Sequence, residues 1–93
     1  MIKSFKCKET EKIWNDGFSK KLPVDIQKRA LNRLMLINLG KNLSDFKTPP
    51  RNCLEALKGD RQGQYSIRIN DQWRICFKWL DNNAFNVEIV DYH

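Results

Sequence analysis

The fold is decided by residues 65–90, YSIRINDQWRICFKWLDNNAFNVEIV, where apolar and polar side chains alternate along three successive runs. Asn70-Asp71 and Asp81-Asn82-Asn83 separate the runs and are typical hairpin-turn residues. Strict alternation predicts antiparallel strands that bury one face and leave the other open. The predicted inward positions are Tyr65, Ile67 and Ile69, then Trp73, Ile75, Phe77 and Trp79, and finally Phe85, Val87 and Ile89.

The N-terminal half predicts the helices that cover this sheet. Residues 2–6 alternate in the same way and predict a first short strand. Residues 10–18 predict a short helix that ends near Gly17, and Pro23 suits the start of a second helix that Gly40 ends. The predicted inward stripe of the second helix is Ala30, Leu31, Leu34, Met35 and Asn38, with Lys28, Arg29 and Arg33 on the solvent side.

The region between the helices and the hairpins predicts a loop. Pro49-Pro50 interrupts regular structure within residues 40–53, and Leu43 and Phe46 are expected to turn inward. Residues 54–57 predict one more short strand. The order strand, two helices, four strands predicts a single α+β domain over residues 1–93, with two layers and a mainly antiparallel sheet under the helices.

Composition indicates an anionic partner. The 93 residues contain 17 Lys and Arg against 11 Asp and Glu, which gives a formal net charge of +6 and a pI near 9.4. Nucleic acid is the commonest partner of such a chain, although a basic surface can also serve solubility alone. Three widely spaced cysteines fit neither a disulfide framework nor a metal site, and we expect reduced thiols in a cytoplasmic protein. No apolar segment predicts a signal peptide or a membrane span.

The open face of the predicted sheet gathers basic side chains. Arg68, Arg74 and Lys78 lie at its outward positions, and Lys58 and Arg61 flank the turn that precedes it. Guanidinium groups held at fixed spacing match phosphate oxygens, so this face is a candidate phosphate clamp. The alternative interpretation is an ordinary solvated face with an ordinary solvated turn.

RNA cleavage is the chemistry that these residues suit best. RNA carries its own nucleophile, the 2′-hydroxyl, so its cleavage needs a base, an acid and positive charge, and no metal. His93, the only histidine, ends the chain after a predicted strand, where the competing interpretation is a frayed terminus. The candidate set is Lys58, Arg74, Tyr92 and His93, with Glu55 or Asp91 as helpers.

Five stretches resemble the HigB killer proteins, which are toxins of bacterial toxin–antitoxin pairs within the RelE/ParE superfamily. The resemblance runs from the first residue to the last. The turn motif, the Trp-Arg-Ile motif and the terminal Asp-Tyr-His are specific in combination. The stretches are Met1–Phe5, Leu57–Gly63, Ser66–Asn70, Trp73–Ile75 and Val90–His93.

The resemblance implies a RelE-like fold and a ribosome-dependent activity. Such toxins enter the A site of the 70S ribosome and cut messenger RNA through the 2′-hydroxyl, without metal or cofactor. A helix-turn-helix antitoxin of the HigA type neutralises them, and operator DNA is bound only through that antitoxin. No membrane is involved.

The resemblance also implies roles for single residues. Lys58 and Arg74 would hold and neutralise the phosphate, and the terminal Asp91, Tyr92 and His93 would complete the site. Some members have a histidine where this chain has Glu55, so the implied general base is either Glu55 or the terminal histidine.

Two other functions compete with this one. The first is a ParE-like toxin that inhibits DNA gyrase without nuclease activity. The second is a plain nucleic-acid-binding module. The terminal histidine and the Trp-Arg-Ile motif favour the nuclease, because a gyrase inhibitor needs neither.

Overall fold

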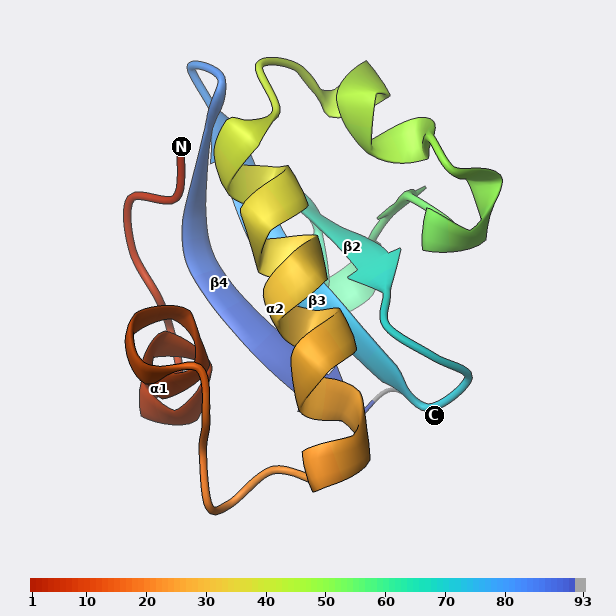
Figure 1. Cartoon of the computed structure of the whole chain (residues 1–93). Coiled ribbons are helices and arrows are strands. Elements are labelled where there is room, and N and C mark those ends of the chain that lie inside the picture. Colours follow the sequence, from red (N-terminus) through yellow and green to blue (C-terminus); the bar gives the residue numbers. More distant parts are fainter. Residues whose placement is uncertain (92–93) are drawn as a thin grey trace.

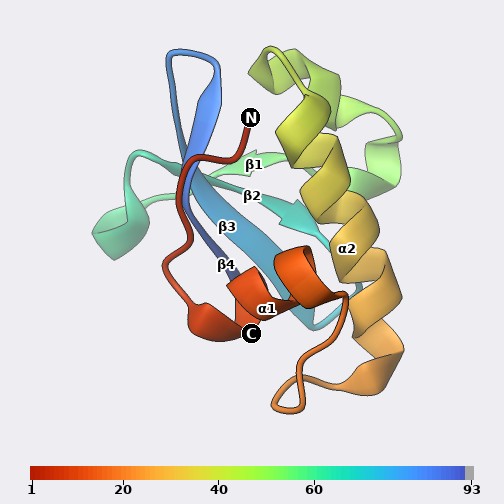
Figure 2. The ribbon, with the colours of Figure 1, turned by 60° about the vertical axis from the view of Figure 1, so that its left-hand side comes forward.

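The computed structural model describes residues 1–91 and shows two helices packed on one face of a four-stranded antiparallel sheet (Figure 1). Figure 2 shows α2 along that face, with the turn η3 on the other side of the sheet. The predicted α+β fold is therefore confirmed. The helices are α1 (Lys8–Asp16) and α2 (Val24–Leu39), and the 3₁₀ turns are η1 (Leu43–Lys47), η2 (Pro50–Asn52) and η3 (Gly59–Arg61). The strands, in their order across the sheet, are β1 (Glu55–Ala56), β2 (Gln64–Arg68), β3 (Trp73–Leu80) and β4 (Asn83–Asp91).

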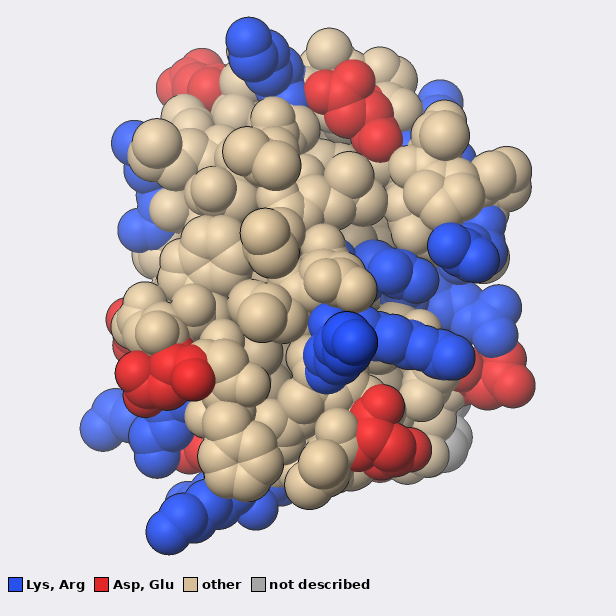
Figure 3. Space-filling view, viewed as in Figure 1, with Lys and Arg blue, Asp and Glu red and all other residues tan. Residues whose placement is uncertain are grey.

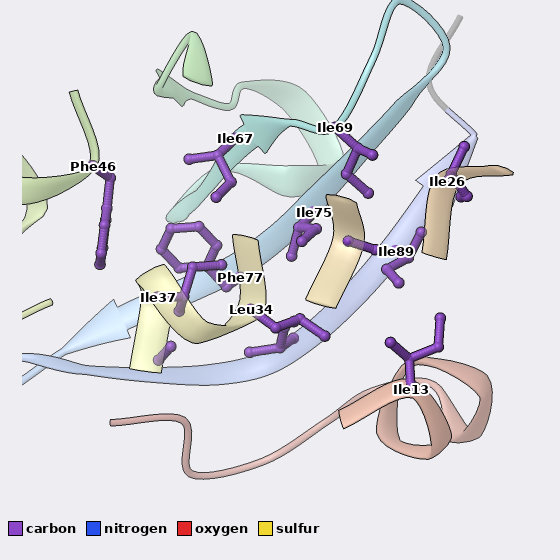
Figure 4. Close-up of a cluster of buried hydrophobic side chains, with 13 residues drawn as sticks. Ile13, Ile26, Leu34, Ile37, Phe46, Ile67, Ile69, Ile75, Phe77 and Ile89 are labelled. Carbon is purple, nitrogen blue, oxygen red and sulfur yellow. The ribbon is translucent and has the colours of Figure 1, made fainter. Parts of the chain in front are cut away.

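The hydrophobic core fills the space between the helices and the sheet (Figure 4). Phe46, from the loop, closes one end of it. Its ring packs edge-on against Phe77 and Trp79, with centroid distances of 5.8 and 5.2 Å. The loop residue predicted to turn inward is thus fully buried. The helices and the sheet contribute Ile13, Ile26, Ala30, Leu34, Ile37, Ile67, Ile69, Ile75, Phe77, Ala84, Val87 and Ile89.

The inward stripe of α2 was predicted partly wrongly. Met35 is 48% exposed, whereas Ile37 is fully buried. The buried positions follow Ile26, Ala30, Leu34 and Ile37, a register rotated by part of a turn from the prediction. Spacings of three and four fit both neighbouring registers, so only the packing against the sheet chooses between them.

The predicted first strand is reduced to two isolated bridges, from Ile2 to Ala84 and from Phe5 to Val87, both parallel to β4. Asn86 separates them, because its left-handed backbone, with φ of 53°, interrupts the regular ladder of β4. The Ser4 hydroxyl accepts a hydrogen bond from the backbone nitrogen of Asn86 at 2.8 Å. The N-terminal segment therefore follows β4 around a bulge.

This bulge also corrects the predicted orientation of Phe85. Phe85 pairs with Lys78, and Ala84 pairs with Trp79. Paired residues project to the same side of a sheet, so Phe85 joins Lys78 on the open face. Ala84 takes the core position and is fully buried. An extra residue in one strand reverses the alternation on either side of it, which a pattern of period two cannot show.

Gly40 ends α2 for a different reason from the predicted one. Its φ of −64° is open to any residue, so no left-handed cap requires glycine here. A Cβ atom at Gly40 would overlap the Phe46 ring. The glycine is needed for the close approach of the helix end to the ring that closes the core.

We expect Gly40→Ala to destabilise the protein by about 1–3 kcal/mol, because the added methyl group overpacks the core against Phe46. Thermal unfolding should show a fall in Tm of roughly 4–8 °C for each kcal/mol lost. The control is the same substitution in a Phe46→Leu background, where a smaller side chain leaves room for the methyl group. An equal cost in both backgrounds would contradict the steric explanation.

Candidate active site on the open sheet face

The strand register lines up polar residues across the open face of the sheet. Glu55 pairs with Ser66, Ser66 with Cys76, and Cys76 with Glu88, so these four residues form one row across all four strands. Arg74 belongs to the next row, between Arg68 and Val90. Side chains that are up to 33 residues apart in the sequence, from Glu55 to Glu88, therefore lie on the same face of the sheet.

Arg74 is held in place by its neighbours. Its Nε donates to the Ser66 hydroxyl at 2.8 Å, and its Nη2 donates to the Cys53 carbonyl at 2.5 Å. Ser66 is fully buried, and Cys53 has a left-handed backbone with φ of 49° and ψ of 53°. Non-glycine residues seldom adopt that conformation, and such residues are concentrated at functional sites. The guanidinium is thus preorganised.

Arg61 is brought to the same face by an acidic residue, Glu88, that was not among the predicted site residues. Arg61 comes from η3, and its Nη1 lies 3.3 Å from Glu88 Oε2 and 3.2 Å from Gln64 Oε1. Lys6 Nζ approaches the same Glu88 carboxylate at 3.5 Å. The outward position of Glu88 in β4 was the available signal, but its partner on η3 is 27 residues away in the chain.

Cys76 marks the centre of this group of charges. Burial raises the pKa of the Cys76 thiol; Arg61 and Arg74 act in the opposite direction, and Glu88 and Glu55 reinforce the rise. Glu55, Cys76 and Glu88 lie in one row across the sheet, and Arg74 and Arg61 contact that row at Ser66 and Glu88. Two of the predicted catalytic residues, Arg74 and Glu55, and the predicted phosphate ligand Arg61 are brought together here.

The other predicted site residues lie around this group or outside it. Lys58 is exposed and immediately precedes η3, and Lys78 is exposed beside Phe85. Arg68 pairs with Asp71 at the hairpin. Tyr92 and His93 lie outside the described residues.

Asp91, which was predicted to complete the site together with Tyr92 and His93, is the last residue of β4. It pairs with Trp73, whereas Arg74 pairs with Val90, so Asp91 projects to the helix-covered face at the end of the sheet. Its carboxylate accepts a hydrogen bond from Gln72 Nε2 at 3.0 Å. This contact fixes the end of β4 against the hairpin.

Within residues 1–91, no group of three or more His, Cys, Asp or Glu side chains is arranged to hold a metal ion. In the same part of the chain, neither helix is both long and apolar enough to cross a membrane.

The same fold occurs in solved structures of toxin–antitoxin complexes. Two solved YoeB–YefM structures from Staphylococcus aureus, one titled as a heterotetrameric toxin–antitoxin complex, match with a TM-score of 0.60. Each match covers 100% of this chain and 98% of the solved chain, at 18% and 19% identity. The two helices on an antiparallel sheet are the RelE-like toxin fold.

Sequence comparison gives the particular family. Residues 3–93 match the model of the HigB-like toxins, described as RelE-like toxins of the type II toxin–antitoxin system HigB. Toxin HigB-1 of Vibrio cholerae is 34% identical over 87 residues, 92% of each chain. Endoribonuclease HigB of Proteus vulgaris is 32% identical over 93 residues, 100% of both chains. The chain belongs to the HigB-like toxin family, which confirms the resemblance seen in the sequence.

Proposed function

We propose that this protein is the toxin of a type II toxin–antitoxin pair and an endoribonuclease that cuts messenger RNA on the ribosome. Family membership and the relative named Endoribonuclease HigB support the nuclease activity. The observation that carries the proposal is the Arg74 guanidinium, which Ser66 and Cys53 fix on the open face, beside the strand position of Glu55, the register partner of Ser66. A fixed cation beside a carboxylate is what attack by a 2′-hydroxyl requires.

In the proposed mechanism, Glu55 takes the proton of the 2′-hydroxyl. The 2′-oxygen then forms a bond to phosphorus, the bond from phosphorus to the 5′-oxygen breaks, and His93 gives a proton to that leaving oxygen. The products are a 2′,3′-cyclic phosphate and a 5′-hydroxyl. The proton count balances without a metal or a cofactor.

The basic residues stabilise the negative charge that develops during this reaction. Arg74 and Lys58 neutralise the phosphorane, because positioned donors are most effective where charge develops. Arg61, held by Glu88, increases the positive electrostatic potential over the same surface. Lys78, on that surface, binds the RNA backbone.

The end of the chain completes the proposed site. The hydrogen bond from Gln72 to Asp91 anchors the strand end from which Tyr92 and His93 continue. Asp91 is thus assigned as a positioning residue, and Tyr92 as a hydroxyl that contacts the reacting phosphate.

The proposed partners follow from the same assignment. The solved structures of similar fold are toxin–antitoxin complexes, which supports an antitoxin partner for this chain. We assign a helix-turn-helix protein of the HigA type, operator DNA bound through that protein, and the ribosomal A site. All of these lie in the cytoplasm.

We expect the purified protein to cut messenger RNA on translating ribosomes and to leave the same RNA intact when it is free in solution. The cut ends should be a 2′,3′-cyclic phosphate and a 5′-hydroxyl, and a single 2′-deoxynucleotide at the cleavage position should abolish cutting. Protein dialysed against EDTA should cut at the same rate. Mapping and labelling the RNA ends measures all of these results.

Each part of the proposal has its own contrary result. Equal cutting of free RNA would reject ribosome dependence. A 5′-phosphate end, or cutting at the deoxynucleotide, would reject attack by the 2′-hydroxyl. Loss of activity after dialysis, restored by a divalent metal, would reject the metal-free scheme.

A further inference from the structure

A second cluster of basic side chains lies beside α2, over η2 and the end of β2 (Figure 3). It surrounds a pocket of about 450 Å³. Four arginines come together there from three elements and were not predicted to meet. The pocket is lined by Arg29, Asn32, Arg33, Arg51, Arg68, Ile69, Asn70 and Asp71.

The positive charge of this arginine pocket is poorly compensated. Within residues 1–91, Arg68 is the one lining arginine that pairs with a carboxylate, that of Asp71. Arg29 and Arg33 are four residues apart on α2, where like charges repel. Burial lowers the pKa of Arg33, and the nearby charges of Arg51 and Arg29 lower it further. An anion in the pocket would relieve this repulsion.

The structure nevertheless holds Arg33 in place. Arg33 Nε donates to the Arg68 backbone carbonyl at 3.2 Å, which ties α2 to the end of β2. Guanidinium groups fixed in this way present their paired N–H donors at defined positions. Their fork geometry matches the oxygens of a phosphate group.

The pocket lies close to the candidate active site. Arg68, which lines the pocket, is the register partner of Arg74 on the neighbouring strand. Directly paired residues in an antiparallel sheet have Cα atoms about 4.5–5.5 Å apart. A polyanion that places one phosphate at Arg74 can therefore place a neighbouring phosphate in the pocket.

The lining favours a nucleic acid over a protein segment. Among residues 1–91, Ile69 is the only apolar residue that lines the pocket, and it is 3% exposed. Protein partners are usually anchored by apolar or aromatic side chains in desolvated pockets, and this pocket offers little apolar surface for them. RNA backbone binding needs mainly positive charge and fixed hydrogen-bond donors.

We propose that the pocket formed by Arg29, Arg33, Arg51 and Arg68 binds a backbone phosphate of single-stranded RNA next to the phosphate that is cut. This inference rests on the proposed function, because it takes RNA as the substrate. It adds a binding site that holds the strand without taking part in the chemistry.

The test measures RNA binding separately from cleavage. The probe is a fluorescent single-stranded oligonucleotide with 2′-O-methyl groups throughout, which has no 2′-hydroxyl and cannot be cut. The test variant is Arg29→Ala with Arg51→Ala, because both side chains are exposed. The control variant, Lys8→Ala with Lys20→Ala, removes two exposed charges near α1 and outside the pocket. Both variants should keep the wild-type Tm.

We expect the pocket variant to bind the probe at least tenfold more weakly than the control variant. Its plot of log K against log salt should be shallower than that of wild type by about 0.7, the change expected when one phosphate contact on a single strand is lost. Equal binding by the two variants, or no binding by the wild type, would overturn the inference. So would unchanged RNA binding together with lost binding to the antitoxin, because the pocket would then serve a protein.

Failure of the proposed function would be recognised separately. A wild type that binds the probe through the pocket, yet leaves messenger RNA uncut on ribosomes, would support the binding site and reject the nuclease. A wild type that cuts messenger RNA normally but binds the probe independently of the pocket would support the nuclease and reject the binding site.

Discussion

Arg74→Ala is expected to reduce single-turnover cleavage of messenger RNA by about 10²–10³-fold, the usual effect of removing one preorganised donor from a developing charge. Arg74 is suited to this role because the Ser66 hydroxyl and the Cys53 carbonyl fix its guanidinium before substrate arrives. In cells, the variant should allow growth equal to that with an empty vector. Cleavage of ribosome-bound RNA and growth after induction are the two measurements.

Two further variants separate charge from geometry. Arg74→Lys keeps the charge but loses the planar guanidinium with its paired N–H donors, so we expect this variant to lose most of the activity. Ser66→Ala removes the hydroxyl that receives the Nε hydrogen bond and should lower activity less than loss of Arg74 itself. Lys20→Ala is the control for the loss of one exposed positive charge. An Arg74→Ala protein as active as wild type, with the same Tm, would reject the clamp.

Glu55→Gln is expected to reduce cleavage by about 10²–10⁴-fold, because the amide cannot accept the proton of the 2′-hydroxyl. The carboxylate is exposed on the open face, in the row that contains Ser66 and Cys76. An exposed side chain on a two-residue strand contributes little to stability, so the Tm should stay unchanged. Single-turnover cutting on ribosomes measures the rate.

Rescue by histidine distinguishes a base from a residue that only shapes the site. Imidazole also accepts a proton near neutral pH, so Glu55→His should recover most of the lost rate. The matched variant is His93→Gln, which should slow departure of the 5′-oxygen. Full activity of Glu55→Gln combined with inactive His93→Gln would transfer the role of the base to His93.

Several features of the fold follow from local sequence and were predicted correctly. The alternation in β2 and β3 predicts which of their side chains face the core. The Asn70 side chain caps the first hairpin by accepting hydrogen bonds from Gln72 and Trp73, at 2.9 and 2.8 Å. Asp81 and Asn82 both adopt the positive φ that a tight hairpin turn requires. These features depend on neighbours within a few residues.

Local sequence also determines which charged side chains lie on the open face of the sheet. Arg74 projects outward because Trp73 and Ile75 project inward, Glu55 lies in the short strand before the turn, and Arg61 lies in the turn itself. The residues of the proposed site were therefore named from the sequence, although their mutual contacts were not.

Only the tertiary structure decided the contacts between distant parts of the chain. The bulge at Asn86 places Phe85 on the open face, Glu88 meets Arg61 across 27 residues, and Arg51 joins Arg29 beside α2. The physical reason is that register, helix rotation and bulges are set by packing the whole core at once. A pattern of period two or 3.6 fixes which side of an element is buried, but not which residue of another element it meets.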